Sequence, residues 1–137
     1  MATREAQQPC RILLADSGEL LCEQVKAMLA GTCCEIVAVR DGFDVICRLP
    51  GIRPDLLLIS SELPRLNGLQ ICALLRQCPD YRELPVVLMV NDATAVKQAR
   101  AELAGVSECL QKPFRRSELE AALMRLVNSD SVLTAVA

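Results

Sequence analysis

Five short apolar runs alternate with segments of helical periodicity along this chain, and only short connections separate them. The apolar runs are residues 11–15, 35–39, 55–59, 85–90 and 108–111. Short helical crossovers force neighbouring strands to be parallel, and their right-handedness places helices on both faces of the sheet. The pattern therefore predicts an α/β fold: a doubly wound five-stranded parallel sheet of order 2-1-3-4-5, which is the flavodoxin-like arrangement.

The segments between the strands carry helix start and stop signals. Helices are expected at 18–30, 43–49 and 66–77, in a segment capped by Asp92 and ended by Gly105, and after Ser117. Pro50 and Gly51 are expected to close the second helix. The fourth helix carries Val96, Ala99 and Leu103 at helical spacing. Ser117, with Glu120 three residues later, has the spacing of a capping box.

Composition limits the classes of protein to which the chain can belong. It has 137 residues, 52% of them hydrophobic and 23% charged, with a formal net charge of −2. These values predict one globular domain at residues 10–127, a flexible amino-terminal arm at 1–9 and a carboxyl-terminal tail at 128–137. With no basic run, secretory signal or apolar stretch of membrane-spanning length, we expect a cytoplasmic protein that binds neither nucleic acid nor membrane.

Eight cysteines are many for a chain of this length. Zinc-site spacing is absent, because the sequence has no Cys-x-x-Cys pair and no histidine. Cys22, Cys47 and Cys72 fall within helical patterns and are expected to be small core residues. The adjacent Cys33 and Cys34 are expected to form a turn and a strand start, with redox activity or soft-metal binding as the alternative.

Chemistry in a sheet of this kind is expected at the carboxyl ends of the strands, where ligands bind at the switch point beside the first strand. Asp16 and Ser17 follow the first strand, Ser60 ends the third and Val90 ends the fourth. The fifth strand leads into a segment that runs from Cys109 to Lys112, so residues 109–112 complete this edge.

Several motifs, in order and at matching spacings, carry a resemblance to one family. They are Ile12 to Asp16, Asp41-Gly42, Pro54-Asp55-Leu56, Pro64 with Gly68, Pro85-Val86, and Lys112-Pro113-Phe114. Over about residues 11–127 the chain resembles the receiver domain of bacterial two-component response regulators. That resemblance implies the receiver fold and a signalling role without enzymatic activity or catalytic residues of its own.

The resemblance also assigns roles to positions, and most of the functional side chains differ. Receivers usually open with two acidic residues that help to hold Mg²⁺; Asp16 fits the first, and Ser17 replaces the second. Ser60 stands where the phosphate-accepting aspartate is expected. Val90 replaces the hydroxyl residue that follows the phosphate on activation.

At the fifth strand, one functional residue of the family is replaced and another is retained. Cys109 stands in place of the aromatic switch residue, whereas Lys112 matches the lysine that pairs with the phosphoryl oxygens. Pro113 matches a proline that in this family follows a cis peptide bond. These differences predict a degenerate phosphorylation site with weak or absent Mg²⁺ binding and no cofactor. Lys112 could instead reach Asp16 or the Ser60 hydroxyl, which would leave a neutral pocket that locks the domain in one conformer.

The leading hypothesis is an atypical receiver, or pseudo-receiver, that acts through phosphorylation-independent protein–protein contacts. In the family, the face formed by the fourth helix, fifth strand and fifth helix binds partners or a second copy, which corresponds to about residues 92–127 here. Residues 35–37, 41–44 and 69–75 resemble single-domain regulators of type IV pilus twitching motility. That likeness predicts a chemotaxis-like pathway that controls pili.

Two alternatives remain open at this point. A conventional regulator could accept phosphate through another acid, either Glu62 or Asp16. A thiol-based sensor could use the cysteine excess, and peroxide treatment that modifies one cysteine selectively would favour it.

Overall fold

The computed structural model describes residues 9–127 and contains the predicted sheet. The expected tail and, apart from Pro9, the expected arm lie outside the described residues. Five parallel strands follow the order β2-β1-β3-β4-β5. They are β1 (Cys10–Ala15), β2 (Cys34–Val39), β3 (Leu56–Ser60), β4 (Val86–Val90) and β5 (Glu108–Gln111). The predicted fold class and strand order are confirmed.

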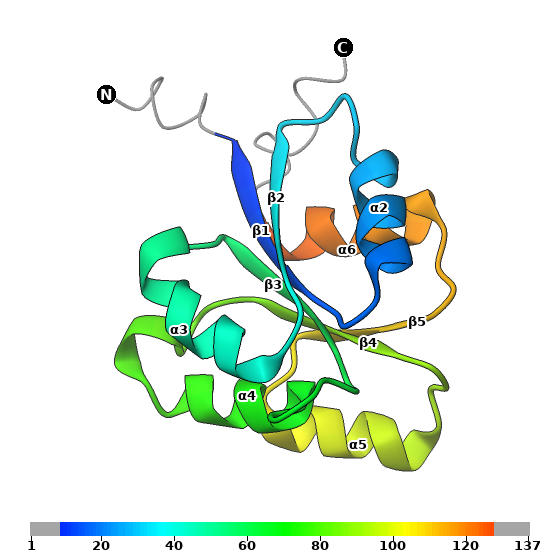
Figure 1. Ribbon diagram of the computed structural model, residues 1–137. Helices are drawn as coiled ribbons and strands as arrows, with labels where there is room; N and C mark the ends of the chain where they lie inside the picture. Colours follow the sequence, from blue (N-terminus) through cyan, green and yellow to red (C-terminus); the bar gives the residue numbers. More distant parts are fainter. Residues whose placement is uncertain (1–8, 128–137) are drawn as a thin grey trace.

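Helices cover both faces of the sheet (Figure 1). On one face lie α2 (Glu19–Met28) and α6 (Arg116–Leu126). On the other lie α3 (Gly42–Ile52), α4 (Gly68–Arg76) and α5 (Ala95–Ala104), with a short 3-10 turn at Pro79–Tyr81 before β4. Within residues 9–127, none of the helices has the length and apolar character that crossing a membrane would require.

The central strands supply most of the core. Every residue of β3 and β4 is buried, which is why their sequences are almost continuously apolar and do not alternate. Ser60, the last residue of β3, is the polar exception and is 2% exposed. A buried polar group needs hydrogen-bond partners, so its surroundings decide what this edge of the sheet can do.

The predicted end of the second helix is wrong. Helix α3 continues through Pro50 and Gly51 to Ile52, and Arg53 then adopts a left-handed conformation with φ of 53°. Leu49 and Ile52 are both buried beneath this last turn. Burial of these two side chains outweighs the hydrogen bond that Pro50 cannot donate.

The predicted caps of the last two helices are also wrong. Thr94, not Asp92, caps α5 by accepting a hydrogen bond from the Lys97 backbone. Ser117 lies inside the first turn of α6, and the Glu118 carboxylate accepts the Arg115 N–H at 2.9 Å instead. A carboxylate at the amino end of a helix satisfies an orphan donor and complements the helix dipole, so it can replace a serine cap.

Helix α5 packs differently from its sequence pattern. Ala101 is its buried residue, whereas Val96 is 62% and Leu103 is 89% exposed. The small side chain of Ala101 packs inward, and the larger apolar side chains point outward. The helix therefore presents an unpartnered apolar stripe within the described part of the chain.

A close approach at Gly68 holds the start of α4 against the end of β3. A Cβ atom at this position would lie 2.5 Å from the Ser60 carbonyl oxygen and 2.6 Å from a methyl carbon of Leu88. Only glycine fits without displacing backbone, and the segment between β3 and α4 is positioned accordingly.

We predict opposite effects for two glycine-to-alanine substitutions. Gly68→Ala should lower the free energy of unfolding by about 1–3 kcal/mol, because the added methyl overlaps backbone. Gly51→Ala should raise it by about 0.5–1 kcal/mol, because alanine is the better helix former and nothing lies within 4 Å of its Cβ position. Chemical denaturation of both variants checks this; a neutral Gly68→Ala would contradict the close packing at β3.

Candidate functional site

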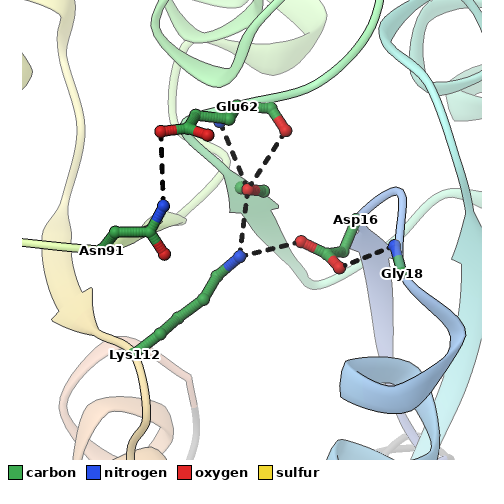
Figure 2. Close-up of polar contacts among 6 residues, drawn as sticks. Asp16, Gly18, Glu62, Asn91 and Lys112 are labelled. Atoms are coloured by element: carbon green, nitrogen blue, oxygen red, sulfur yellow. Dashed lines mark hydrogen bonds and ion pairs between the residues drawn. The ribbon is translucent and has the colours of Figure 1, made fainter.

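The carboxyl edge of the sheet brings together side chains from three strands that are far apart in sequence (Figure 2). Asp16 follows β1, Ser60 ends β3 and Lys112 follows β5, as the sequence predicts. Parallel strands all end at the same edge, so these three residues converge although up to 96 positions separate them.

Lys112 is the centre of this convergence. Its Nζ donates to Asp16 Oδ1 at 2.9 Å and to Ser60 Oγ at 3.2 Å. The side chains of the ion pair are only 23% exposed for Lys112 and 9% for Asp16. Limited exposure reduces screening by solvent, so this pair is stronger than an ordinary surface salt bridge.

Ser60 has a full set of hydrogen bonds. Its Oγ accepts from Lys112 Nζ and from the Glu62 backbone N–H at 3.2 Å, and it donates to the Glu62 carbonyl at 3.4 Å. A hydroxyl has one donor and two acceptor positions, and all are used here. The serine therefore acts as a satisfied link between β3, the following loop and Lys112.

Asp16 is likewise engaged through both oxygens. Lys112 binds Oδ1, and the Gly18 backbone N–H donates to Oδ2 at 2.9 Å. One carboxylate thus faces one ammonium, and the Asp16–Lys112 pair carries no net charge. The sequence suggested that Lys112 could contact either Asp16 or the Ser60 hydroxyl. In the structure it contacts both.

Comparison with known proteins decides the family. The model of the response regulator receiver domain matches residues 12–124. The chain belongs to the receiver domain family.

Relatives and solved structures agree with this assignment. Protein PilG of Pseudomonas aeruginosa is 25% identical over 126 residues, covering 92% of this chain and 93% of PilG. Response regulator MprA of Mycobacterium sp. (strain KMS) is 31% identical over 124 residues, covering 90% of this chain. The match spans 53% of MprA, so this receiver corresponds to about half of that regulator.

The solved structure of one receiver domain is similar to the structure of this chain. The receiver domain of sensor histidine kinase PA1611 from Pseudomonas aeruginosa superposes with a TM-score of 0.78 at 26% identity, covering 86% of this chain and 97% of that one. That structure has a magnesium ion coordinated in its active-site cleft. Receivers are signalling domains, and the architecture of this chain is theirs.

The side chains of Ser17, Val90 and Cys109, the remaining predicted site residues, take no part in the polar network. Ser17 is exposed, and Val90, 5% exposed, belongs to the apolar core under α3 and α4. Cys109 is half-buried on β5, and burial raises the pKa of its thiol. The Lys112–Pro113 peptide bond is cis, in agreement with the family resemblance.

Sequence reasoning missed one contact at this edge. Asn91, which directly follows β4, donates from Nδ2 to Glu62 Oε2 at 3.3 Å (Figure 2). The two residues border a pocket of about 210 Å³ that Leu69 and Val90 also line. Asn91 could have been found by the same rule as Ser60, since it is a polar residue next to the end of a buried strand.

We predict that breaking the central ion pair costs substantial stability. Lys112→Met should lower the free energy of unfolding by about 2–3 kcal/mol, because it leaves the Asp16 carboxylate buried without its counter-charge. The double variant Asp16→Asn/Lys112→Met should lose less than the two single variants added together. Denaturant titration of the three variants measures this coupling.

The matched control is an exposed pair. Arg40 and Glu19 form a salt bridge whose side chains are 58% and 72% exposed, so Arg40→Met should leave the denaturation midpoint nearly unchanged. Equal effects of Arg40→Met and Lys112→Met would contradict a special role for the Lys112 network.

Proposed function

We propose that this chain is a cytoplasmic pseudo-receiver that signals through protein contacts, has no enzymatic activity and does not require phosphorylation. The observation that carries the proposal is the state of Ser60: a buried hydroxyl at the end of β3, bound by Lys112 and Glu62. The family resemblance implies an aspartate at that position, whose carboxylate would take a phosphoryl group as an acyl phosphate.

Among residues 9–127, no side-chain base forms a hydrogen bond with the Ser60 hydroxyl. An alcohol becomes a useful nucleophile when a neighbouring base removes its proton. The side chain that contacts Ser60 Oγ is an ammonium group, which donates and cannot accept a proton. Asp16 is held by Lys112 and the Gly18 backbone. Ser60 is therefore a poor phosphoryl acceptor.

The donor set does not fit Mg²⁺. This ion needs near-octahedral oxygen ligands, usually with carboxylates among them. Both Asp16 oxygens already accept hydrogen bonds, and the Lys112 ammonium lies 2.9 Å from one of them. Among residues 9–127, no group of three or more histidine, cysteine, aspartate or glutamate side chains gathers in a metal-binding arrangement. We therefore propose that the domain works without metal or other cofactor.

The parts that would transmit a phosphorylation signal are also changed. Val90 offers no hydroxyl to a phosphate oxygen, and Cys109 is a small half-buried thiol where an aromatic rotamer switch is implied. Lys112 bonds Asp16 and Ser60 at the same time, which holds β1, β3 and β5 together at this edge. We infer a single resting conformer that presents a constant surface to its partner.

The docking surface that we propose is formed by α5, β5 and α6, which are the fourth helix, fifth strand and fifth helix of the family. Val96 and Leu103 lie seven positions apart on α5 and so share a side of the helix. Both are exposed, as is Met124 of α6 at 48%. A partner protein with an apolar contact surface would bury them, and a second copy of this chain is the alternative occupant.

The pathway that we propose is chemotaxis-like signalling that controls type IV pili. Its support is the resemblance of residues 35–37, 41–44 and 69–75 to twitching-motility regulators, together with the end-to-end likeness to PilG. Loss of twitching on deletion of the gene from a piliated host would support this assignment, and unchanged twitching would count against it.

We predict that acetyl phosphate with Mg²⁺ leaves the mass of the intact protein unchanged. An aspartate-bearing receiver treated in parallel should gain one phosphoryl group that hydroxylamine removes. A hydroxylamine-labile gain on this chain would contradict the proposal. Repeating the assay with Glu62→Gln and Asp16→Asn would then show whether either acid accepts the phosphate.

We predict that Leu103→Glu removes partner binding and leaves the fold intact, because the side chain projects into solvent. Leu20→Glu on α2 is the matched control, since Leu20 is also exposed, at 69%. The wild-type chain and the two variants serve as baits, and quantitative mass spectrometry of the captured proteins should show partners lost only with Leu103→Glu. Identical sets of captured proteins from all three baits would exclude this face as the docking surface.

A dimer that forms with rising concentration of the wild-type chain, and that Leu103→Glu removes, would identify a second copy of the chain as the occupant.

A further inference from the structure

Two cysteines lie side by side at the amino-terminal edge of the sheet, at the opposite end of the strands from Ser60. Cys10 opens β1 and Cys34 opens β2, and the two are direct register partners in the parallel ladder. Figure 1 shows these two strands side by side. The two cysteine side chains belong to the same apolar cluster, beneath α2 and α6. Both are free thiols.

The spacing of this pair suits a disulfide. Adjacent strands lie about 4.8 Å apart, and disulfides join Cα atoms about 4.4–6.8 Å apart. The two thiols are also close enough for each to shift the pKa of the other. Bond formation therefore needs side-chain rotation and little movement of the backbone.

The two thiols differ in access. Cys10 is 1% exposed, whereas Cys34 is half-buried and lines a surface pocket of about 240 Å³ between α2 and β2. Lys26 and Thr32 also border this pocket. A small reagent can reach Cys34, and Cys10 lies directly behind it.

The thiols also differ in acidity. The interaction with the Cys10 thiol, helped by Thr32, lowers the pKa of Cys34 to about 7 although burial and Glu120 oppose the shift. The same interaction, together with burial, raises the pKa of Cys10. Burial raises the pKa of Cys22 and Cys72 as well. Near neutral pH, Cys34 therefore has the thiolate character that reaction with oxidants requires.

We propose that Cys34 and Cys10 form a peroxide-sensitive dithiol in which Cys34 reacts first and Cys10 resolves. The Cys34 thiolate attacks one oxygen of a hydroperoxide such as hydrogen peroxide. The O–O bond breaks, hydroxide leaves and takes up a proton from solvent, and a sulfenic acid forms on Cys34. The Cys10 sulfur then attacks the Cys34 sulfur, the S–O bond breaks, and water leaves with the Cys10 proton.

The balance of this reaction is complete. The two thiols lose two protons and two electrons, and one hydrogen peroxide molecule takes them up to become two water molecules. A dithiol reductant reverses the reaction by thiol–disulfide exchange. The product joins β1 to β2 covalently, so oxidation ties the edge strand β2 to the centre of the sheet. This proposal goes beyond the proposed pseudo-receiver function and does not depend on it.

The test is mild hydrogen peroxide treatment of the full chain, alkylation of the remaining thiols and peptide mass spectrometry. We expect a Cys10–Cys34 cross-linked peptide that disappears on reduction, and a higher melting temperature for the oxidised form. Cys34→Ser should abolish the cross-link. Cys10→Ala should stop the reaction at a Cys34 sulfenic acid that dimedone traps.

Matched controls separate this pair from its neighbours. Cys33→Ser, one residue away, and Cys47→Ser, an exposed cysteine on α3, should both retain the cross-link. A disulfide that contains Cys33, or oxidation of Cys47 or Cys78 before Cys34, would overturn the proposal. If Cys10→Ala does not fold, iodoacetamide labelling of the wild-type chain decides, since Cys34 must react faster at neutral pH than exposed Cys47 and Cys78.

Discussion

The ammonium group of Lys112 ties together three strands at the edge of the sheet where receivers carry out their chemistry. It bonds Asp16 after β1 and Ser60 at the end of β3 while standing at the end of β5. In our account, a receiver with several carboxylates at this edge needs a divalent cation to offset their repulsion. Here one acid and one base compensate each other within the chain. In our proposal the rest of the site follows from this pairing, because Lys112 already holds the Asp16 and Ser60 side chains that a metal or phosphoryl group would need.

Such a site changes which parts of the domain can receive a signal. If phosphorylation does not act at the carboxyl edge, regulation depends on the docking surface and on modifications elsewhere. The exposed apolar stripe of α5 suits docking, and the paired thiols at the amino-terminal edge suit a chemical input. These two regions lie on different sides of the molecule, so a partner on α5 need not block access to Cys34. In our proposal the receiver fold is kept as a scaffold while its original chemistry is lost.

Much of this structure could be predicted from the sequence, for identifiable physical reasons. Buried parallel strands need continuous apolar runs, and their order follows from short right-handed crossovers, so β1 to β5 were found with small errors at their ends. The contact of Lys112 with Asp16 and Ser60 followed from the rule that such strands share one edge.

The predictions that were wrong concern features that depend on side-chain packing. Helix α3 continues through Pro50 because Leu49 and Ile52 are buried there. In α5, Val96 and Leu103 face outward because Ala101 packs inward. Cys47, expected in the core, is exposed, whereas Cys22 and Cys72 are buried as predicted. The pairing of Cys10 with Cys34 was not visible, because register between strands is set by three-dimensional alignment and not by local pattern.

The most direct test of the central claim is to follow the backbone amide NMR signals of Asp16, Ser60 and Lys112 during titration with Mg²⁺ and then with beryllofluoride, which mimics a phosphoryl group. Our account predicts that these signals keep their positions throughout, and that the thermal stability of the chain does not rise. Saturable shifts at these residues, spreading toward β5 when beryllofluoride is added, would show that the site binds metal and phosphoryl groups, and would contradict the account.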